Sequence, residues 1–127
     1  MRKSLIIVVA LLLFGGCTQQ ESHVQKLDSM QAFEMSSQQE DIVIVDVRTV
    51  AEYSEGHFQD SINVPLDQIR NSMESIIESK NTPIFVVCRS GNRSAQAQSM
   101  LLSMGYTDVI DIGSVFDWPE TLIVSNP

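Results

Sequence analysis

Runs of apolar residues alternate along most of the chain with segments that have the spacing of helices. The runs at 42–47 and 84–87 are almost wholly apolar, which is typical of central parallel strands covered by helices on both faces. Shorter runs at 61–64 and 109–112 predict two more strands, and residues 24–27 predict a short edge strand. The pattern therefore predicts about five strands.

Four segments around these strands predict helices. In the longest, 66–80, apolar residues recur at helical spacing, at positions 66, 69, 73, 76 and 77. The others lie at 29–35, 49–54 and 93–104. Strands that alternate with helices predict a single α/β domain, in which right-handed crossovers build a central, mainly parallel sheet with helices on both faces.

The starts of the first two helices carry their own signals. Asp28 or Ser29 is placed to cap the first helix, in which Met30 is expected to face the core. Thr49 with Glu52 three residues later forms a capping-box pattern for the second. These signals predict where the chain turns into each helix.

The first 22 residues follow a different pattern. Arg2 and Lys3 precede a continuous apolar run at 5–14, which is too short to span a bilayer as a permanent helix but fits a signal peptide. Gly15-Gly16-Cys17 follows, and small residues ahead of a cysteine resemble the lipobox of bacterial lipoprotein precursors.

That resemblance divides the chain into three parts. We expect residues 1–16 to be a signal peptide, residues 17–22 a lipidated N-terminus and tether beginning at Cys17, and residues 23–127 the folded domain. The protein would be exported and held by its lipid to a membrane, facing the periplasm or the cell exterior. A plain secretory peptide, and an uncleaved anchor or buried N-terminal helix, are the alternatives.

The charge of the chain limits its partners. The whole chain has a net charge of −8, and removal of residues 1–16 would leave six basic against sixteen acidic residues, a net charge of −10. Nucleic acid is therefore not an expected partner, because its binding depends on cationic contacts to phosphate. An anionic substrate would have to be held by local positive charges.

Cys17 and Cys88 are the two cysteines of the chain. If Cys17 carries lipid, Cys88 is the only free thiol and no intramolecular disulfide can form. A solitary thiol in an oxidising compartment is a liability unless it is buried or used. This makes Cys88 the first candidate for chemistry.

The segment that begins at Cys88 lies where a predicted buried strand ends and a helix begins. Ligands collect at the carboxyl ends of parallel strands, and the start of a helix presents free backbone N–H groups to the occupant of the loop. Those donors, with Arg89 and Arg93, favour a thiolate. Gly91 gives the backbone the freedom to curl around an anion. The segment predicts a nucleophilic cysteine in an anion-binding loop.

Cys88 to Arg93 also matches the Cys-Arg-x-Gly-x-Arg active-site loop of the rhodanese family of thiosulfate sulfurtransferases. The resemblance covers essentially the whole mature domain and is closest to small, single-domain, exported bacterial members. It includes Asp46-Val47-Arg48, Glu52-Tyr53, Gly56-His57, Ile62-Asn63-Val64-Pro65, Gly105-Tyr106, Val109 and Trp118-Pro119. Two turns depart from the family pattern, at Gln59-Asp60-Ser61 and Gly113-Ser114.

The resemblance implies a two-step reaction. The Cys88 thiolate would attack the outer sulfur of thiosulfate and expel sulfite, and a thiol or cyanide acceptor would take the sulfur from the resulting persulfide. The donor would be bound by the loop residues Arg89, Ser90, Gly91, Asn92 and Arg93, of which Arg93 in particular would hold the sulfonate. No metal and no organic cofactor is implied. We expect a monomer that binds an anionic sulfur donor and passes the sulfur to a thiol or cyanide acceptor. Its lipid would attach it to a membrane.

Three further residues are expected to support the site structurally. Asp46 and Arg48 could be interpreted as an acid/base pair, but a buried ion pair or loop anchor is the favoured interpretation. His57 invites comparison with Cys–His catalytic pairs, yet in the Gly-His setting of this family it is expected to be structural. Trp118 is expected to pack in the core.

Two other functions fit parts of the pattern. Cysteine-dependent phosphatases and arsenate reductases use a related loop, but with five residues between cysteine and arginine. Here four residues separate Cys88 from Arg93, so the ring of amides suits a sulfur atom better than a tetrahedral phosphate. A non-catalytic, membrane-anchored rhodanese-like binding module is the other alternative, which the intact Cys88 disfavours.

Overall fold

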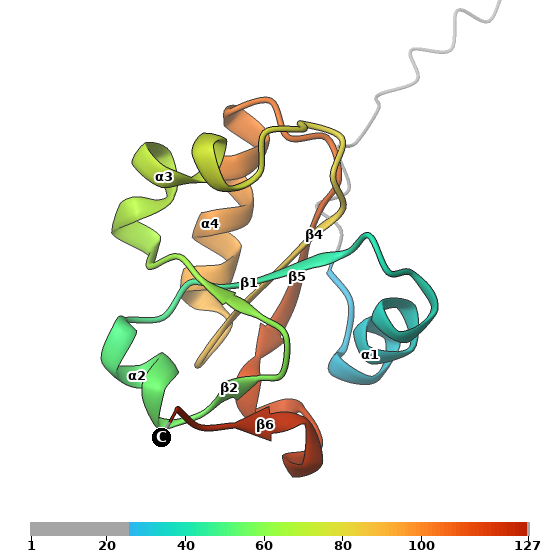
Figure 1. Cartoon of the computed structure of the whole chain (residues 1–127). Helices are drawn as coiled ribbons and strands as arrows, with labels where there is room; N and C mark the ends of the chain where they lie inside the picture. Colours follow the sequence, from blue (N-terminus) through green and yellow to red (C-terminus); the bar gives the residue numbers. More distant parts are fainter. Residues whose placement is uncertain (1–25, 127) are drawn as a thin grey trace, which may run out of the picture.

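The computed structural model describes residues 26–126, and at its centre is a parallel sheet in the order β3-β1-β4-β5 (Figure 1). Its four strands are β1 (Val43–Asp46), β3 (Ile62–Asn63), β4 (Ile84–Cys88) and β5 (Val109–Ser114). The predicted α/β class and parallel sheet are confirmed. Within residues 26–126 this sheet has four strands. Of the edge strand predicted at 24–27, Lys26 forms a parallel bridge with Asp111, and residues 24 and 25 lie outside the described residues.

Helices cover both faces of this sheet, as expected (Figure 1). On one face the helices bury Met73 and Leu101 in a cluster with Val86. On the other face Ala32 is buried in a second cluster with Phe85. Adjacent residues of β4 thus enter different clusters, which explains why this strand is apolar on both faces. The helices are α1 (Ser29–Gln38), α2 (Val50–Glu55), α3 (Ile69–Ile76) and α4 (Asn92–Ser103).

Capping boxes start α1 and α2. The Asp28 carboxylate accepts a hydrogen bond from the backbone N–H of Gln31 at 2.9 Å. At α2 the Thr49 hydroxyl accepts from the N–H of Glu52 at 3.2 Å, and the Glu52 carboxylate accepts from the N–H of Thr49 at 3.0 Å. Both predicted caps are confirmed. The inward orientation expected of Met30 is wrong, because 54% of this residue is exposed.

The helix predicted at 66–80 is divided and shorter than expected. The 3-10 turn η1 (Leu66–Gln68) precedes α3, which ends at Ile76. Ile77 is already extended, with φ −126° and ψ 93°, and it is buried. The hydroxyl of Tyr106 donates to the Ile77 carbonyl at 2.6 Å. A contact with a distant part of the chain thus stabilises the end of α3.

An antiparallel pair that the sequence pattern did not predict lies beside α2. It joins β2 (His57–Phe58) to β6 (Ile123–Val124). The N–H of Asn126 donates to the carbonyl of Ser54 at 3.3 Å, so the last described residues contact α2. Two 3-10 turns connect β5 to β6, η2 (Val115–Asp117) and η3 (Glu120–Leu122).

No helix within residues 26–126 is long and apolar enough to cross a membrane. The signal peptide predicted at 1–16 and the lipidated segment predicted at 17–22 lie outside the described residues. Both remain predictions.

Candidate active site

Cys88 is the last residue of β4 and is fully buried. The chain then makes a short loop, and Gly91 caps the start of α4 in the left-handed conformation, with φ 86°. A side chain at this position would be strained, which explains the need for glycine. The loop therefore has the predicted strand–loop–helix geometry at the carboxyl end of the sheet.

The Cys88 sulfur is held by the start of α4. The backbone N–H of Gly91 donates to Sγ at 2.9 Å, and the Ser94 hydroxyl lies 3.4 Å from Sγ. Ser94 in turn donates to the Gly91 carbonyl at 3.1 Å. A hydroxyl and an N–H group thus both contact the sulfur. The sequence motif does not indicate this role of Ser94, although a hydroxyl in the first turn of α4 is a signal for it.

Arg93 is bound to a residue from another part of the chain. Its Nη1 lies 2.7 Å from Glu52 Oε2 and its Nη2 lies 3.0 Å from Oε1, so the two side chains form a bidentate pair. Glu52 is on α2, 41 residues earlier. The sequence pattern indicates only a capping role for Glu52. The guanidinium expected to hold the donor is therefore occupied by a carboxylate.

This pair shifts the pKa values of both groups, in opposite directions. The hydrogen bonds from Arg93 lower the pKa of Glu52 from 4.5 to about 2. The hydrogen bonds to Glu52 raise the pKa of Arg93. Both groups are therefore ionised over the whole physiological range, and the positive charge of Arg93 is largely compensated.

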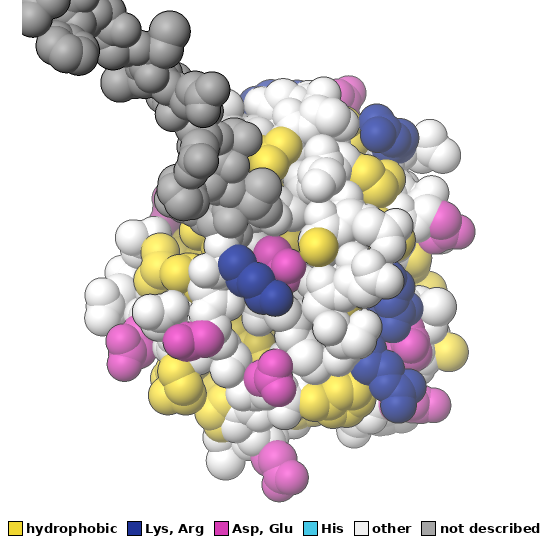
Figure 2. Space-filling model, turned by 180° about the vertical axis from the view of Figure 1, so that it is seen from behind, with side chains coloured by type: hydrophobic (Ala, Val, Ile, Leu, Met, Phe, Trp, Pro, Cys, Tyr) yellow, Lys and Arg dark blue, Asp and Glu magenta, His cyan; other side chains and the backbone are white. Residues whose placement is uncertain are grey.

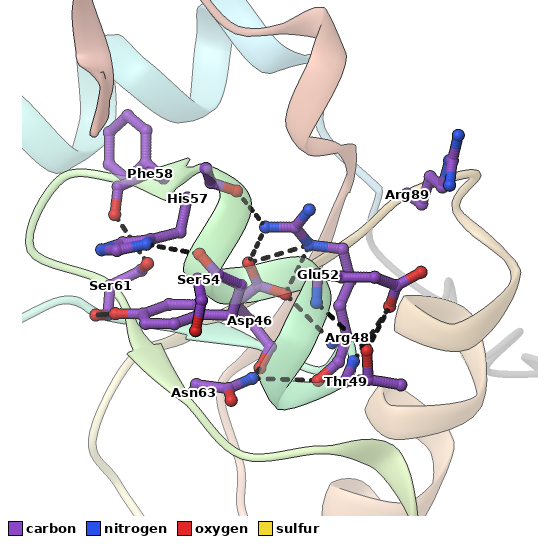
Figure 3. Close-up of polar contacts among 12 residues, drawn as sticks. Asp46, Arg48, Thr49, Glu52, Ser54, His57, Phe58, Ser61, Asn63 and Arg89 are labelled. Atoms are coloured by element: carbon purple, nitrogen blue, oxygen red, sulfur yellow. Dashed lines mark hydrogen bonds and ion pairs between the residues drawn. The ribbon is translucent and has the colours of Figure 1, made fainter. Parts of the chain in front are cut away.

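Among the described residues, the other positive charges near the loop belong to Arg89 and Lys26, and their surroundings differ from those of Arg93. Arg89 is exposed, and its guanidinium carbon lies 5.6 Å from the ring centre of Phe116. Figure 3 shows Arg89 standing apart from the polar contacts drawn there. A Cβ placed on Gly91 would lie 4.0 Å from the Lys26 ammonium, so Lys26 also lies close to the loop, which the sequence did not indicate. Ser90 and Asn92 are exposed.

Asp46 and Arg48 form a buried ion pair (Figure 3). Arg48 Nη2 lies 2.7 Å from Asp46 Oδ2 and also donates to the Gly56 carbonyl at 2.6 Å. The Asn63 amide donates to the carbonyls of Asp46 and Arg48 at 3.0 and 2.9 Å. The pair thus connects β1, α2 and β3 below the loop. This geometry is that of the predicted structural anchor.

His57 is tied into the same scaffold. Its ring is stacked on that of Tyr53 with 3.6 Å between centroids, and Nδ1 lies 2.7 Å from the Tyr53 carbonyl oxygen (Figure 3). The Tyr53 hydroxyl donates to the Ser61 carbonyl at 2.6 Å. These contacts join α2 to the start of β2. Within the described residues His57 makes no hydrogen bond to Cys88.

An open cavity of about 490 Å³ lies beside the loop, between α2 and the segment after β5. Its lining includes Glu52, which binds Arg93, and Phe116, which contacts Arg89. Trp118 also borders it but is mainly a core residue, since only 4% is exposed and its ring lies 4.2 Å from that of Phe58. The expected packing role of Trp118 is confirmed.

The chemistry available at this site is that of a nucleophilic thiol. A buried sulfur accepts a hydrogen bond from a backbone N–H at the start of a helix, and an open cavity lies near the loop. Within residues 26–126 no cluster of three or more His, Cys, Asp or Glu side chains is arranged to hold a metal ion. The fold and the loop define a class of protein in which the strand-end cysteine is the reactive group.

The Rhodanese-like domain model matches residues 29–120, and the chain belongs to this family of sulfurtransferases. Thiosulfate sulfurtransferase PspE of Escherichia coli K12 is 36% identical over 73 residues, covering 58% of this chain and 70% of that protein. A sulfurtransferase of Allochromatium vinosum is 33% identical over 96 residues, covering 75% and 88%. The match to the adenylyltransferase and sulfurtransferase uba4 of Ogataea parapolymorpha is 36% identical over 107 residues but spans only 27% of that longer protein.

Solved structures agree with this assignment. A structure described as rhodanese with anions from E. coli has a TM-score of 0.62 and 32% identity, over 67% of this chain and 99% of that one. A rhodanese-related protein of Thermoplasma volcanium has a TM-score of 0.68 and 26% identity, over 80% and 99%. Sulfur transfer is therefore the reaction class of this protein.

Proposed function

We propose that this protein is a thiosulfate sulfurtransferase that carries the transferred sulfur as a persulfide on Cys88. The observation that carries the proposal is the contact of the Gly91 N–H with the buried Cys88 sulfur, 2.9 Å away at the start of α4. A donor in this position stabilises a thiolate before reaction and a sulfur anion after it. The similarity to thiosulfate sulfurtransferase PspE supports thiosulfate as the donor.

In the first step the Cys88 thiolate attacks the outer sulfur of thiosulfate. A bond forms between Cys88 Sγ and that sulfur, the sulfur–sulfur bond of thiosulfate breaks, and its electron pair leaves with sulfite. The total charge is −3 on both sides, and neither an oxidant nor a reductant is needed. The Gly91 N–H, which already donates to Sγ, is placed to stabilise the negative charge of the persulfide.

In the second step an acceptor attacks the outer sulfur of the persulfide. Cyanide gives thiocyanate and a thiolate gives a new persulfide, and in both cases the electron pair returns to Cys88 Sγ. The acceptor would approach from the open cavity, whose lining residues Glu52 and Phe116 contact Arg93 and Arg89 of the loop. The protein thus alternates between two covalent states, as ping-pong kinetics require.

The test uses full-length protein with Cys17→Ser, in which Cys88 is the only cysteine. This protein should transfer sulfur from thiosulfate to cyanide, and the further change Cys88→Ser should abolish the activity. The serine hydroxyl fits the same space, so the thermal unfolding temperature should change little. Activity above about a tenth of the control in the Cys88→Ser protein, where a serine cannot form the persulfide, would refute the proposal.

We also propose that the mature protein is exported and anchored by a lipid on Cys17. The support is the apolar run at 5–14 and the tripeptide Gly15-Gly16-Cys17 that follows it. Two or more acyl chains hold a protein stably to a membrane, whereas one does not. Cys17→Ser should therefore release the protein from the membrane fraction of its native host. Retention of the variant in that fraction would show another kind of anchor.

A further inference from the structure

The Glu52 carboxylate binds Arg93, the cationic group of the loop that is expected to bind an anionic donor. Both of its carboxylate oxygens bind Arg93, at 2.7 and 3.0 Å, in the geometry that a sulfonate would need. The ion pair is partly exposed to solvent, because 28% of the Arg93 side chain and 25% of the Glu52 side chain are exposed. A donor can therefore reach the pair, but it meets a guanidinium that already has an anion.

The surroundings offset this negative charge only in part. The chain has twice as many acidic as basic residues, and on the face shown in Figure 2 neutral and acidic side chains separate the positive ones. The nearby Arg48 is itself paired with Asp46. Arg89 and Lys26 are the remaining described cations close to the loop. A dianion approaching Cys88 is thus opposed by Glu52 at close range.

Resting on the function proposed above, we infer that Glu52 determines donor specificity by competing with the donor for Arg93. Before a donor binds, the Glu52 carboxylate lowers the affinity of the loop for free dianions. The loop therefore favours sulfur donors that carry less negative charge. Glu52 touches neither Cys88 nor, in this scheme, the donor. It acts through Arg93, so it is a specificity-determining residue rather than a catalytic one.

Two sulfur donors that react in the same way but differ in charge can isolate the electrostatic effect of Glu52 on donor binding. Thiosulfate is a dianion that expels sulfite, and benzenethiosulfonate is a monoanion that expels benzenesulfinate. In both reactions the thiolate of Cys88 attacks the outer sulfur and the electron pair leaves with the inner one. Coulomb energy is proportional to the charge of the donor, so any change at Glu52 should affect thiosulfate about twice as strongly on a logarithmic scale.

The decisive variant is Glu52→Gln. Glutamine keeps the capping box of α2 and one acceptor for Arg93 but removes the charge. We expect KM to fall on the order of ten-fold for thiosulfate and about three-fold for benzenethiosulfonate, since the logarithm of the effect follows donor charge. The values of kcat should change by less than about two-fold, because the thiol and its donors are untouched.

Two matched controls accompany it. Glu55→Gln removes the same charge from the same helix, at a residue that makes no ion pair in the described chain. Glu74→Gln breaks the exposed pair with Lys80. Neither should change the ratio of the two KM values.

The outcomes are distinct. An unchanged KM for thiosulfate in Glu52→Gln would show that the donor does not use Arg93, and a raised KM would show that Glu52 holds Arg93 in its productive position. Either result overturns the inference, as does an equal change in Glu55→Gln. If the wild-type protein takes sulfur from neither donor, the proposed function itself fails.

Discussion

Two arginine–carboxylate pairs contact α2 or its C-cap Gly56, and they differ in burial and in how far apart their partners lie in the sequence. In the pair of Arg48 with Asp46, 4% and 0% of the side chains are exposed, and the residues are two positions apart. In the pair of Arg93 with Glu52 the exposed fractions are 28% and 25%, and the residues are 41 positions apart. The shortest distance is 2.7 Å in both.

The comparison shows that similar bonds can have different roles. The Arg48 guanidinium of the buried pair also donates to the Gly56 carbonyl, and the backbone carbonyls of Asp46 and Arg48 accept from Asn63, so the pair is bonded to several parts of the fold. The partly exposed pair joins the reactive loop to a short helix. In our proposal an anionic donor replaces the Glu52 carboxylate at Arg93. We therefore interpret the first as part of the fold and the second as part of the specificity of the site.

The largest effect on stability is expected from Asp46→Ala. Removing one partner of a buried pair leaves the Arg48 charge uncompensated, which typically costs about 3–5 kcal/mol. Chemical denaturation would measure the loss. The double variant Asp46→Ala/Arg48→Met should recover part of the free energy of unfolding. A loss as small as that of Arg93→Ala would contradict the distinction between the two pairs.

The largest effect on donor binding is expected from Arg93→Ala. The change removes the guanidinium and leaves the Glu52 charge unpaired beside the loop, so kcat/KM for thiosulfate should fall ten- to a hundred-fold, equivalent to about 1.5–3 kcal/mol. Steady-state kinetics would show it, with the exposed Arg70→Ala as control. Adding Glu52→Gln to Arg93→Ala should restore part of the affinity. Equal behaviour of Arg93→Ala and Arg70→Ala would exclude Arg93 from donor binding.

A smaller effect concerns the dependence of stability on pH. The pKa of Glu52 is lowered from 4.5 to about 2 in the folded protein. Its contribution to stability is therefore fully present above pH 4.5 and is lost as the pH falls towards 2. The difference in the free energy of unfolding between wild type and Glu52→Gln should shrink over this window. A difference that stays constant would show that the pair does not stabilise the fold.

The smallest effect is expected from Arg89→Ala. Arg89 is exposed. Its guanidinium lies over the ring of Phe116, and its backbone carbonyl accepts from the Ser114 hydroxyl. The KM for thiosulfate should therefore rise less than in Arg93→Ala and more than in Arg70→Ala, because a cation near the loop is only partly screened. A rise as large as that of Arg93→Ala would move the sulfonate site from Arg93 to Arg89.

Local signals in the sequence accounted for the reactive loop. A buried strand, a glycine and a helix start within a few residues place Cys88 at the sheet edge, and the capping boxes of α1 and α2 are also local. The pairing of β2 with β6 could not be predicted, because strands of two residues have no periodicity to detect. Nor could the pair of Glu52 with Arg93, because only the tertiary fold brings α2 to the loop.

The central claim is that Cys88 carries the transferred sulfur, and intact-protein mass spectrometry tests it most directly. Full-length Cys17→Ser protein would be exposed to thiosulfate, freed of reagent, and measured before and after addition of cyanide. We predict a mass increase of one sulfur atom, located on the peptide that contains Cys88, and its loss with cyanide. An unchanged mass, or a sulfur that cyanide does not remove, would contradict the account.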